Sequence, residues 1–379
     1  MRIVHTSDWH AGRLWRRVNR IGELEAALTS MCEWVEGNAV DLVLMTGDVF
    51  DNGSPHPEAE RLVFRVLKRL GKVCPVVLIA GNHDDPRRIE AWGQLAELAQ
   101  IHCIAKPRRV EAGGILEFRS RDGRERARVA PIPFAPIKWF VEAAGIVDEG
   151  KAMAGYAEKV SGLAAHLAEG FSADAINILM AHTHVEGAKL ARSERAATVG
   201  EQWAVTPENL PLSAQYIALG HIHRPQAVRH GVEYAGSPLQ LDFGEEGEEK
   251  SFVVIDATVG VPVRVTRVAY LGGTPLKTFE GSWAELEAAA GWLKDAGHLR
   301  VQLKLDKIEP DLVANVRRLV PNAIIVKARL PEVERVASVH ASDATPLDRY
   351  RVYHAKRHGM GPDAAVEEAF RALWEEVTA

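Results

Sequence analysis

Five apolar, β-branched runs along this chain each end in a short cluster of His, Asp or Asn side chains. Runs of this length and composition are typical of buried strands. Ligands bind beyond the carboxyl ends of the strands in open α/β sheets, so we expect the clusters to converge in the folded chain. The clusters occupy 7–10, 47–51, 81–84, 182–184 and 220–223. They predict a polar site at one edge of the sheets.

The order of the expected elements indicates an α/β fold. Three strands alternate with three helices early in the chain: 2–6, 41–46 and 75–80 against about 20–37, 57–71 and 88–99. That order predicts a parallel sheet with right-handed crossovers. Later strands, several joined by short turns, predict a second, mostly antiparallel sheet: 115–119, 125–130, 175–181, 215–219, 225–229, 232–235, 251–256 and 262–269. The expected architecture is a four-layer αββα sandwich of two facing sheets covered by helices.

Gly and Pro residues at 271–275 mark an expected domain boundary, because both interrupt regular structure. The main domain is expected at 1–270 and a small α/β capping domain at 274–335. The capping domain is expected to contain helices at about 283–296 and 310–319 and strands at 299–305 and 323–329. A helical tail is expected at 346–379, broken at 358–362.

The net charge of −5 lacks the basic surplus typical of nucleic-acid-binding proteins, and basic residues are only locally concentrated. No run approaches the roughly 18 apolar residues that span a bilayer. The N-terminus lacks a secretory signal pattern. Three cysteines are too few and too scattered for a disulfide framework. We therefore expect a cytoplasmic protein with buried free thiols and no membrane contact.

The residue types in the clusters are those that bind divalent cations. Carboxylate oxygens suit Mn²⁺ or Mg²⁺, and imidazole adds affinity for Mn²⁺, Fe²⁺ or Zn²⁺. Asp8 and His10 are two residues apart, as are His221 and His223, so each pair faces one side of an extended segment. Two cations about 3.5–4 Å apart hold a phosphoryl group and activate water, which predicts phosphoester hydrolysis. Small residues allow close backbone approach at Gly47, Gly81 and Gly220.

The motif series D-x-H, G-D-x-x-D, G-N-H-D, H and G-H-x-H resembles that of the calcineurin-like metallophosphoesterases. The opening segment RIVHTSDWHAGR, with GDVFDNGSPHP at 47–57 and GSPLQLDFGE at 236–245, further resembles the SbcD family of Mre-type nucleases. The likeness is strong over residues 1 to about 270. For the remaining residues, only the expected order of domains and helices is similar.

This resemblance implies a centre with two divalent metal ions, Mn²⁺ first and Mg²⁺ as the alternative. One ion would be held by Asp8, His10, Asp48 and His223. The other would be held by Asp48, Asn82, His182 and His221, with Asp48 as the bridge. His83 would be the catalytic group that stabilises or protonates the leaving oxygen.

Several supporting assignments leave alternatives. The family has one His in the fourth motif, and we choose His182 over His184 because His182 directly follows the strand. His184 would then contact substrate or cap the turn. Asp51 is expected to orient a ligating His. Asp84 either supports the site similarly or starts the helix beside Pro86.

Side chains near the first motif offer contacts to nucleic acid. Arg13 and Arg16 would reach a DNA phosphate, or else form a solvated basic face. Trp9 and Trp15 are expected to pack in the protein rather than stack on a base.

The tail has amphipathic helical patterns, which must bury their apolar faces on the chain itself or on a partner. The resemblance favours docking on an SbcC-like ATPase of the SMC family. The sequence has no Walker A motif, so any ATP dependence would come from that partner. The expected partner-binding residues are Leu347, Tyr350, Tyr353, Phe370, Leu373 and Trp374.

The resemblance implies an ATP-regulated, nucleoid-associated DNA nuclease subunit for repair, recombination and replication. Its expected activities are 3′→5′ double-strand exonuclease and endonuclease at hairpins or blocked ends, in a homodimer within a heterotetramer. A phosphodiesterase for small molecules, or a protein phosphatase, is the alternative enzyme, although the long C-terminal region argues against it. A non-catalytic DNA-end scaffold is a further alternative, which the complete ligand set disfavours.

Overall fold

The computed structural model describes residues 1–15, 18–96, 99–135, 139, 155–191, 193–194, 204–307, 309–330 and 345–378. The chain divides into two compact units, Met1–Arg329 and Leu330–Ala379. In the described ranges, helices that are both long and apolar enough to cross a membrane are absent.

The first sheet has six strands in the order β16-β15-β1-β4-β5-β6. Four of them run parallel: β1 (Arg2–Thr6), β4 (Leu42–Met45), β5 (Val76–Ile79) and β6 (Ile101–Ile104). Two antiparallel strands, β15 (Ser251–Asp256) and β16 (Arg264–Ala269), complete the edge beside β1. We had expected these last two in the second sheet, which is wrong. Their apolar and β-branched residues indicate strands, but these residues do not specify the strand with which each pairs.

The second sheet has the order β13-β14-β12-β9-β8-β7. Its strands are β7 (Leu116–Arg119), β8 (Arg126–Ile132), β9 (Ile176–His182), β12 (Tyr216–Gly220), β13 (Gln226–Arg229) and β14 (Val232–Tyr234). The expectation of a mostly antiparallel sheet is wrong, because β8, β9, β12 and β14 are parallel. The edge hairpins β7–β8 and β13–β14 are antiparallel. The crossover from β8 to β9 contains helix α6 (Tyr156–Ala168), which we did not predict.

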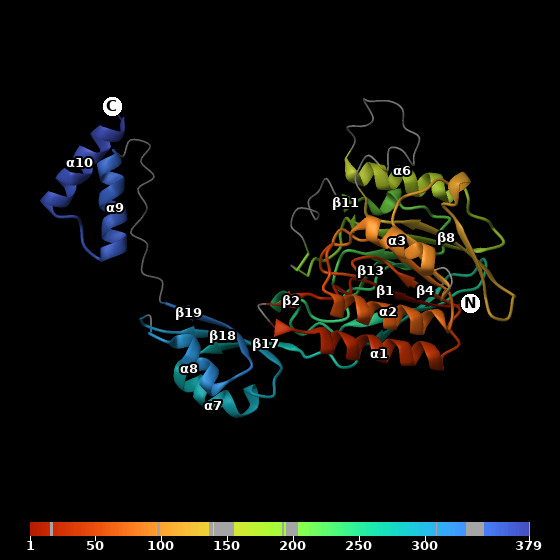
Figure 1. The fold of residues 1–379 in the computed structure, drawn as a ribbon, viewed down its shortest axis with the longest axis horizontal. Helices are drawn as coiled ribbons and strands as arrows, with labels where there is room; N and C mark the ends of the chain where they lie inside the picture. The colour runs from red at the N-terminus through yellow and green to blue at the C-terminus, as the bar shows by residue number, and fades with distance from the viewer. Residues whose placement is uncertain are drawn as a thin grey trace. The chain divides into compact units, whose positions relative to one another are not determined.

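Three buried apolar clusters connect four layers, as expected for the αββα sandwich. Helices α1 (Ile21–Gly37), α2 (Pro57–Gly71) and α3 (Pro86–Ala96) cover the outer face of the first sheet, and α1 and α2 lie side by side (Figure 1). Helix α6 covers the outer face of the second sheet. Alternate strand residues serve the two faces: Val76 packs towards the helices, and Val77 packs between the sheets.

The end of the first unit is a three-stranded parallel sheet with two helices. Its elements are β17 (Leu276–Gly281), α7 (Trp283–Leu293), β18 (His298–Lys304), α8 (Leu312–Leu319) and β19 (Ala323–Arg329). We did not predict β17. A capping box between Ser282 and Glu285 begins α7. This part has its own apolar core and contacts the preceding residues through Trp15, Phe243, Leu276 and Ile325.

The second unit contains two helices, α9 (Pro346–His358) and α10 (Ala364–Thr378). The rings of Tyr350 and Phe370 stack with centroids 4.2 Å apart, and Arg351 forms an ion pair with Glu367. The expected apolar faces therefore pack partly on each other. Leu373 and Trp374 remain exposed by 60% and 46%. Four short strands, β2 (Leu14–Trp15), β3 (Val18–Asn19), β10 (His184–Val185) and β11 (Ala204–Val205), lie in loops of the first unit.

Candidate metal centre

The five polar clusters converge at the carboxyl ends of strands from both sheets. β1, β4 and β5 of the first sheet lead into the first three clusters, and β9 and β12 of the second sheet lead into the other two. Contacts between the clusters bring together all seven expected ligand side chains: Asp8, His10, Asp48, Asn82, His182, His221 and His223.

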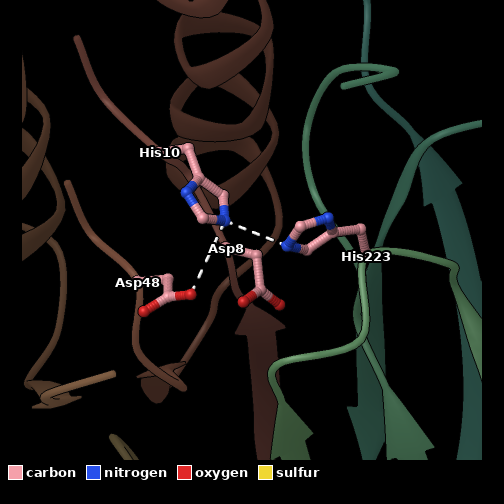
Figure 2. Close-up of side chains that lie close together, drawn as sticks. All are labelled: Asp8, His10, Asp48 and His223. Carbon is pink, nitrogen blue, oxygen red and sulfur yellow. Dashed lines mark hydrogen bonds and ion pairs between the residues drawn. The ribbon is translucent and has the colours of Figure 1, made fainter. Parts of the chain in front are cut away.

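One group of donors consists of Asp8, His10, Asp48 and His223, whose ligand atoms all lie within 4.8 Å of one another. Figure 2 shows these side chains pointing toward one another. The Nε2 atoms of His10 and His223 are 3.0 Å apart, and His10 Nε2 is 3.6 Å from Asp48 Oδ2. All four residues are buried.

A second group of donors adjoins the first through Asp48. Asn82 Oδ1 lies 2.9 Å from His182 Nε2 and 2.9 Å from His221 Nδ1. His182 Nε2 is also 3.6 Å from Asp48 Oδ2, the same oxygen that approaches His10. The Asp48 carboxylate therefore lies between the two groups of donors.

The backbone carrying these donors is locally strained. Asp8, His10, Asp48 and His221 all have positive φ angles, of 50°, 44°, 50° and 97°. Such angles are uncommon outside glycine and cluster at functional sites. Trp9 and Ile222, which lie between pairs of donors, are buried in the apolar cores, so alternate residues of these clusters enter the site.

Two of the neighbouring glycines are required for close approach within the site. A Cβ atom on Gly81 would lie 2.2 Å from both the backbone nitrogen and Oδ1 of Asp48. A Cβ on Gly220 would lie 1.9 Å from the carbonyl oxygen of Thr46. Both contacts are impossible, so the clusters meet only because these positions lack a side chain.

Burial sets the protonation of the donors. It lowers the pKa of His10 to about 3 and the pKa values of His182 and His223 well below the ordinary range. These rings are therefore neutral and have lone pairs to offer. Burial also raises the pKa of Asp8 to about 8, although hydrogen bonds from Ser7 and the backbone of His221 oppose it.

The donor chemistry fits divalent cations. Neutral imidazoles, two carboxylates and one amide oxygen crowd a buried volume, and a divalent ion offsets this concentration of electron pairs. The ring of His182 is already oriented for this purpose: its Nδ1 donates to the Thr46 carbonyl oxygen at 2.7 Å, which leaves Nε2 facing Asp48.

His83 lies at the edge of the cluster, with its side chain 11% exposed. Its Nδ1 contacts the Asp51 carbonyl oxygen at 2.7 Å, an acceptor, so Nδ1 carries the proton. Its Nε2 is 3.9 Å from Asp48 Oδ2. The carboxylate of Asp51 lies 3.4 Å from His10 Nδ1 and 3.8 Å from Arg13 Nη1. Asp51 is therefore placed to orient His10, and Arg13 lies beside the site.

The structure distinguishes the two options for Asp84. The carboxylate accepts hydrogen bonds from the backbone nitrogens of Gly81, Val49 and Phe50, so it joins the second and third clusters. The neighbouring Asp85, instead, accepts from the backbone nitrogen of Arg87 at the start of α3. Asp84 therefore links two clusters that carry expected ligands, and its supporting role stays a prediction.

Other expected site residues lie apart from these contacts. His184 is half-buried in β10, where it pairs with Ala204. Trp9 is buried and donates to Thr6 Oγ1, and Trp15 packs against Phe243. Both tryptophans therefore pack in the protein, as expected. Arg16 lies outside the described residues.

Sequence reasoning missed the groups that hold the ligands from behind. The carbonyl oxygen of Thr46 fixes His182, and the hydroxyl of Ser193 lies 2.5 Å from His223 Nδ1. Ser193 also contacts Glu245. Glu245 belongs to the segment 236–245 that carried part of the resemblance, which was the available signal. Ser193 and Thr46 carried none.

Comparison with known proteins defines the family. Residues 1–225 match the calcineurin-like phosphoesterase family. The SbcD subunit of the SbcCD nuclease of Bacillus subtilis is 30% identical over 98% of this chain and 97% of its own length. The chain belongs to the SbcD family of calcineurin-like phosphoesterases. Its SbcD relatives in Rhodobacter capsulatus and Escherichia coli K12 are 32% and 28% identical, over 73% and 89% of this chain and 73% and 87% of their own lengths. Membership in the SbcD family confirms the expected fold class and a metal-dependent hydrolase.

Proposed function

We propose that this chain is the nuclease subunit of an SbcCD-type complex and that it hydrolyses DNA phosphodiester bonds with two divalent cations. The observation that supports this most strongly is the convergence of seven ligand-type side chains, with Asp48 between the two groups and His83 beside them. The relatives are named as subunits of the SbcCD nuclease, and these names supply the nuclease activity and the partner subunit.

The residues would divide into two ligand sets that share Asp48. One set is Asp8, His10, Asp48 and His223, and the other is Asp48, Asn82, His182 and His221. Mn²⁺ is the proposed metal, and Mg²⁺ is the alternative. When bound, two such cations supply Lewis acidity and lower the pKa of a water molecule.

Protein groups around the ligands perform the remaining tasks. His83 has Nδ1 held by the Asp51 carbonyl oxygen and presents Nε2 on the side of Asp48. As an imidazolium, protonated on both nitrogens, it would donate from Nε2 to stabilise or protonate the leaving oxygen. Asp51 orients His10, and Asp84 holds the second and third clusters together. Arg13 would contact a DNA phosphate at the edge of the site.

The C-terminal parts would supply substrate and partner contacts. We assign 1–270 to hydrolysis, 274–335 to capping of DNA, and 346–379 to docking on an SbcC-like ATPase. The exposed apolar side chains of α9 and α10, such as Leu373 and Trp374, support the docking assignment. A 3′→5′ double-strand exonuclease with hairpin endonuclease activity, in a homodimer within a heterotetramer at the nucleoid, is the complete proposal.

The decisive experiment measures Mn²⁺-dependent digestion of an end-labelled DNA duplex by the wild type, His83→Ala and His230→Ala. His230 is an exposed histidine and serves as the matched control. His83→Ala should lose about 10²–10⁴-fold in cleavage rate while retaining Mn²⁺ and DNA binding. Unchanged cleavage by His83→Ala would contradict its role. Hydrolysis of a model diester without any DNA cleavage, with and without the ATPase, would instead favour the small-molecule phosphodiesterase.

A further inference from the structure

The ring of His223 is held on the side away from the ligand cluster by a chain of hydrogen bonds. Its Nδ1 lies 2.5 Å from the hydroxyl of Ser193, and that hydroxyl donates to Oε1 of Glu245. Glu245 is fully buried. Its other oxygen, Oε2, accepts from Lys250 Nζ at 2.6 Å and from the backbone nitrogen of Leu241 at 3.0 Å. Ring, hydroxyl and carboxylate therefore form one continuous relay.

The direction of this relay follows from the number of protons. A serine hydroxyl has a single proton, so Ser193, which donates to Glu245, must accept from His223. Nδ1 of His223 therefore carries the ring proton, and Nε2 keeps its lone pair. That Nε2 faces His10 Nε2 at 3.0 Å, inside the ligand cluster. A metal ligand needs this tautomer.

The backbone of His223 is held by residues on the same side of the ring as Ser193 and Glu245. Glu194, next to Ser193, accepts from the His223 backbone nitrogen at 3.2 Å. Lys250 Nζ and the backbone nitrogen of Ser237 donate to the His223 carbonyl oxygen at 2.9 and 3.0 Å. Both the position and the proton of His223 are thus fixed from the side opposite the ligands.

We propose that Ser193 and Glu245 are positioning residues that fix the ring proton of His223 on Nδ1 and thereby set the metal affinity of the centre. The inference rests on the proposed metal-binding role of His223. It gives the segment 236–245 a function, because its last residue, Glu245, would act on the metal through two intervening groups without touching it.

The substitution Glu245→Gln tests the relay because it should reverse the direction in which the hydrogen bonds between residue 245, Ser193 and His223 are donated. Lys250 and the Leu241 backbone both donate to the position of Oε2, so the carbonyl oxygen of the new amide should face them. The amide NH₂ group then faces Ser193 and donates to it, and Ser193 must donate to His223. The ring proton of His223 is driven to Nε2, where it blocks metal binding.

The measurements are Mn²⁺ titration of the metal-free full chain by calorimetry and ¹⁵N-histidine NMR of the same sample before Mn²⁺ is added. Glu245→Gln should weaken Mn²⁺ binding about 10–100-fold. The NMR spectrum should show one ring whose proton has moved from Nδ1 to Nε2. Glu248→Gln is the matched control, because Glu248 also contacts Lys250, at 3.2 Å, but lies outside the relay. It should retain wild-type affinity and tautomer.

Unchanged affinity in Glu245→Gln overturns the inference, and so does a loss of affinity without movement of the ring proton. If Glu245→Gln fails to fold, Ser193→Ala makes the test. It should also weaken Mn²⁺ binding, and Ser193→Thr, which keeps the hydroxyl, should restore it. Equal affinities in the Ala and Thr variants overturn the relay. A wild type that binds no Mn²⁺ refutes the metal centre itself, which is a different result.

Discussion

The Nε2 atoms of His10 and His223 lie 3.0 Å apart, although 213 residues separate the two rings in the sequence. One ring follows a strand of the first sheet, and the other follows a strand of the second. Burial lowers the pKa of both rings, so each is neutral near pH 7. A shared cation would use both lone pairs and join the two halves of the sandwich.

Metal binding should therefore stabilise the folded protein. At a free Mn²⁺ concentration 100 times the Kd, linkage raises the free energy of unfolding by about 2.7 kcal/mol. We expect His223→Ala to lose most of this increase, whereas His230→Ala should keep it. Thermal unfolding with Mn²⁺ and with EDTA measures the difference. An equal metal-induced rise in Tm for His223→Ala and the wild type would exclude His223 as a ligand.

Metal affinity should rise with pH, because burial raises the pKa of Asp8 to about 8 from an ordinary value of 3.8. The carboxyl is protonated at pH 7 without a cation, and a cation must displace that proton. Affinity should level off above about pH 8, and binding at pH 7 should release about one proton. Calorimetry in buffers of different ionisation enthalpy measures this release. Affinity that stays constant between pH 6 and 8 would contradict the prediction.

The same pKa predicts the stability of the metal-free protein. Asp8 holds a proton in the folded state but not in the unfolded state between about pH 4 and 8, so its contribution to the free energy of unfolding falls as pH rises through this range. The buried neutral histidines His10, His182 and His223 contribute in the opposite sense below about pH 6.5. Asp8→Asn should remove this negative contribution from the pH dependence of the free energy of unfolding. Urea denaturation at several pH values with EDTA provides the comparison. If the free energy of unfolding depends on pH identically in the variant and the wild type, Asp8 makes no such contribution.

Gly81→Ala should inactivate the protein, because the added Cβ would meet the nitrogen and Oδ1 of Asp48 at 2.2 Å. We expect overpacking to lower the free energy of unfolding by about 1–3 kcal/mol. Gly93→Ala is the control: its Cβ would meet Cys103 at an ordinary 3.7 Å, inside helix α3. It should be neutral or stabilise by up to about 1 kcal/mol. Nuclease assays and urea denaturation distinguish the two, and a fully active Gly81→Ala would contradict the packing argument.

Glu23 should contribute acid-sensitive stability. Burial opposes its ionisation, but hydrogen bonds from His298 and Arg20 lower the pKa of Glu23 to about 2. Its contribution is complete above the ordinary value of 4.5 and is lost as pH falls toward 2. Glu23→Gln should lower the free energy of unfolding by about 1.5–3 kcal/mol at pH 7, with a smaller difference below pH 4.5. Urea denaturation measures both, and a difference that grows in acid would reverse the sign we expect.

The helical tail should bind the ATPase partner through its exposed apolar side chains. Leu373→Glu introduces a charge where the side chain is 60% exposed, so α9 and α10 should remain folded while partner binding falls at least about tenfold. Glu368→Ala, at another exposed position of α10, is the control. Co-purification with an SbcC-like ATPase measures binding. Mn²⁺-dependent cleavage by the isolated chain should be the same in all three proteins.

The features that the sequence predicted correctly were mostly local: single strands and the polar clusters that follow them. The strands before Asp8, Asp48 and Asn82 were recognisable from their apolar composition, and the clusters at their ends implied convergence. Strand pairing was not recognisable, because the residues of β15 and β16 indicate strands without specifying which strand each one pairs with. The second sheet was misassigned because its hairpins are at the edges, whereas its central strands are joined by longer crossovers.

The groups that hydrogen-bond to the ligand rings, such as Thr46 and Ser193, could not be predicted for a related reason. A carbonyl oxygen such as that of Thr46 has no sequence signature, and Ser193 lies 30 residues from the ring it holds. Such contacts depend on where long loops return, which only the folded chain specifies. The ligands themselves are chemically distinctive, and their supports are not.

The apolar core between the two sheets joins residues such as Ile3 and Val77 to Ile178 and Tyr216. A nascent chain leaving the ribosome contains Asp8, His10 and Asp48 long before His223 has been synthesised. The donor set is therefore incomplete until the second sheet has been translated and has packed on the first. An unfinished polypeptide would therefore lack the hydrolytic activity proposed for the complete chain.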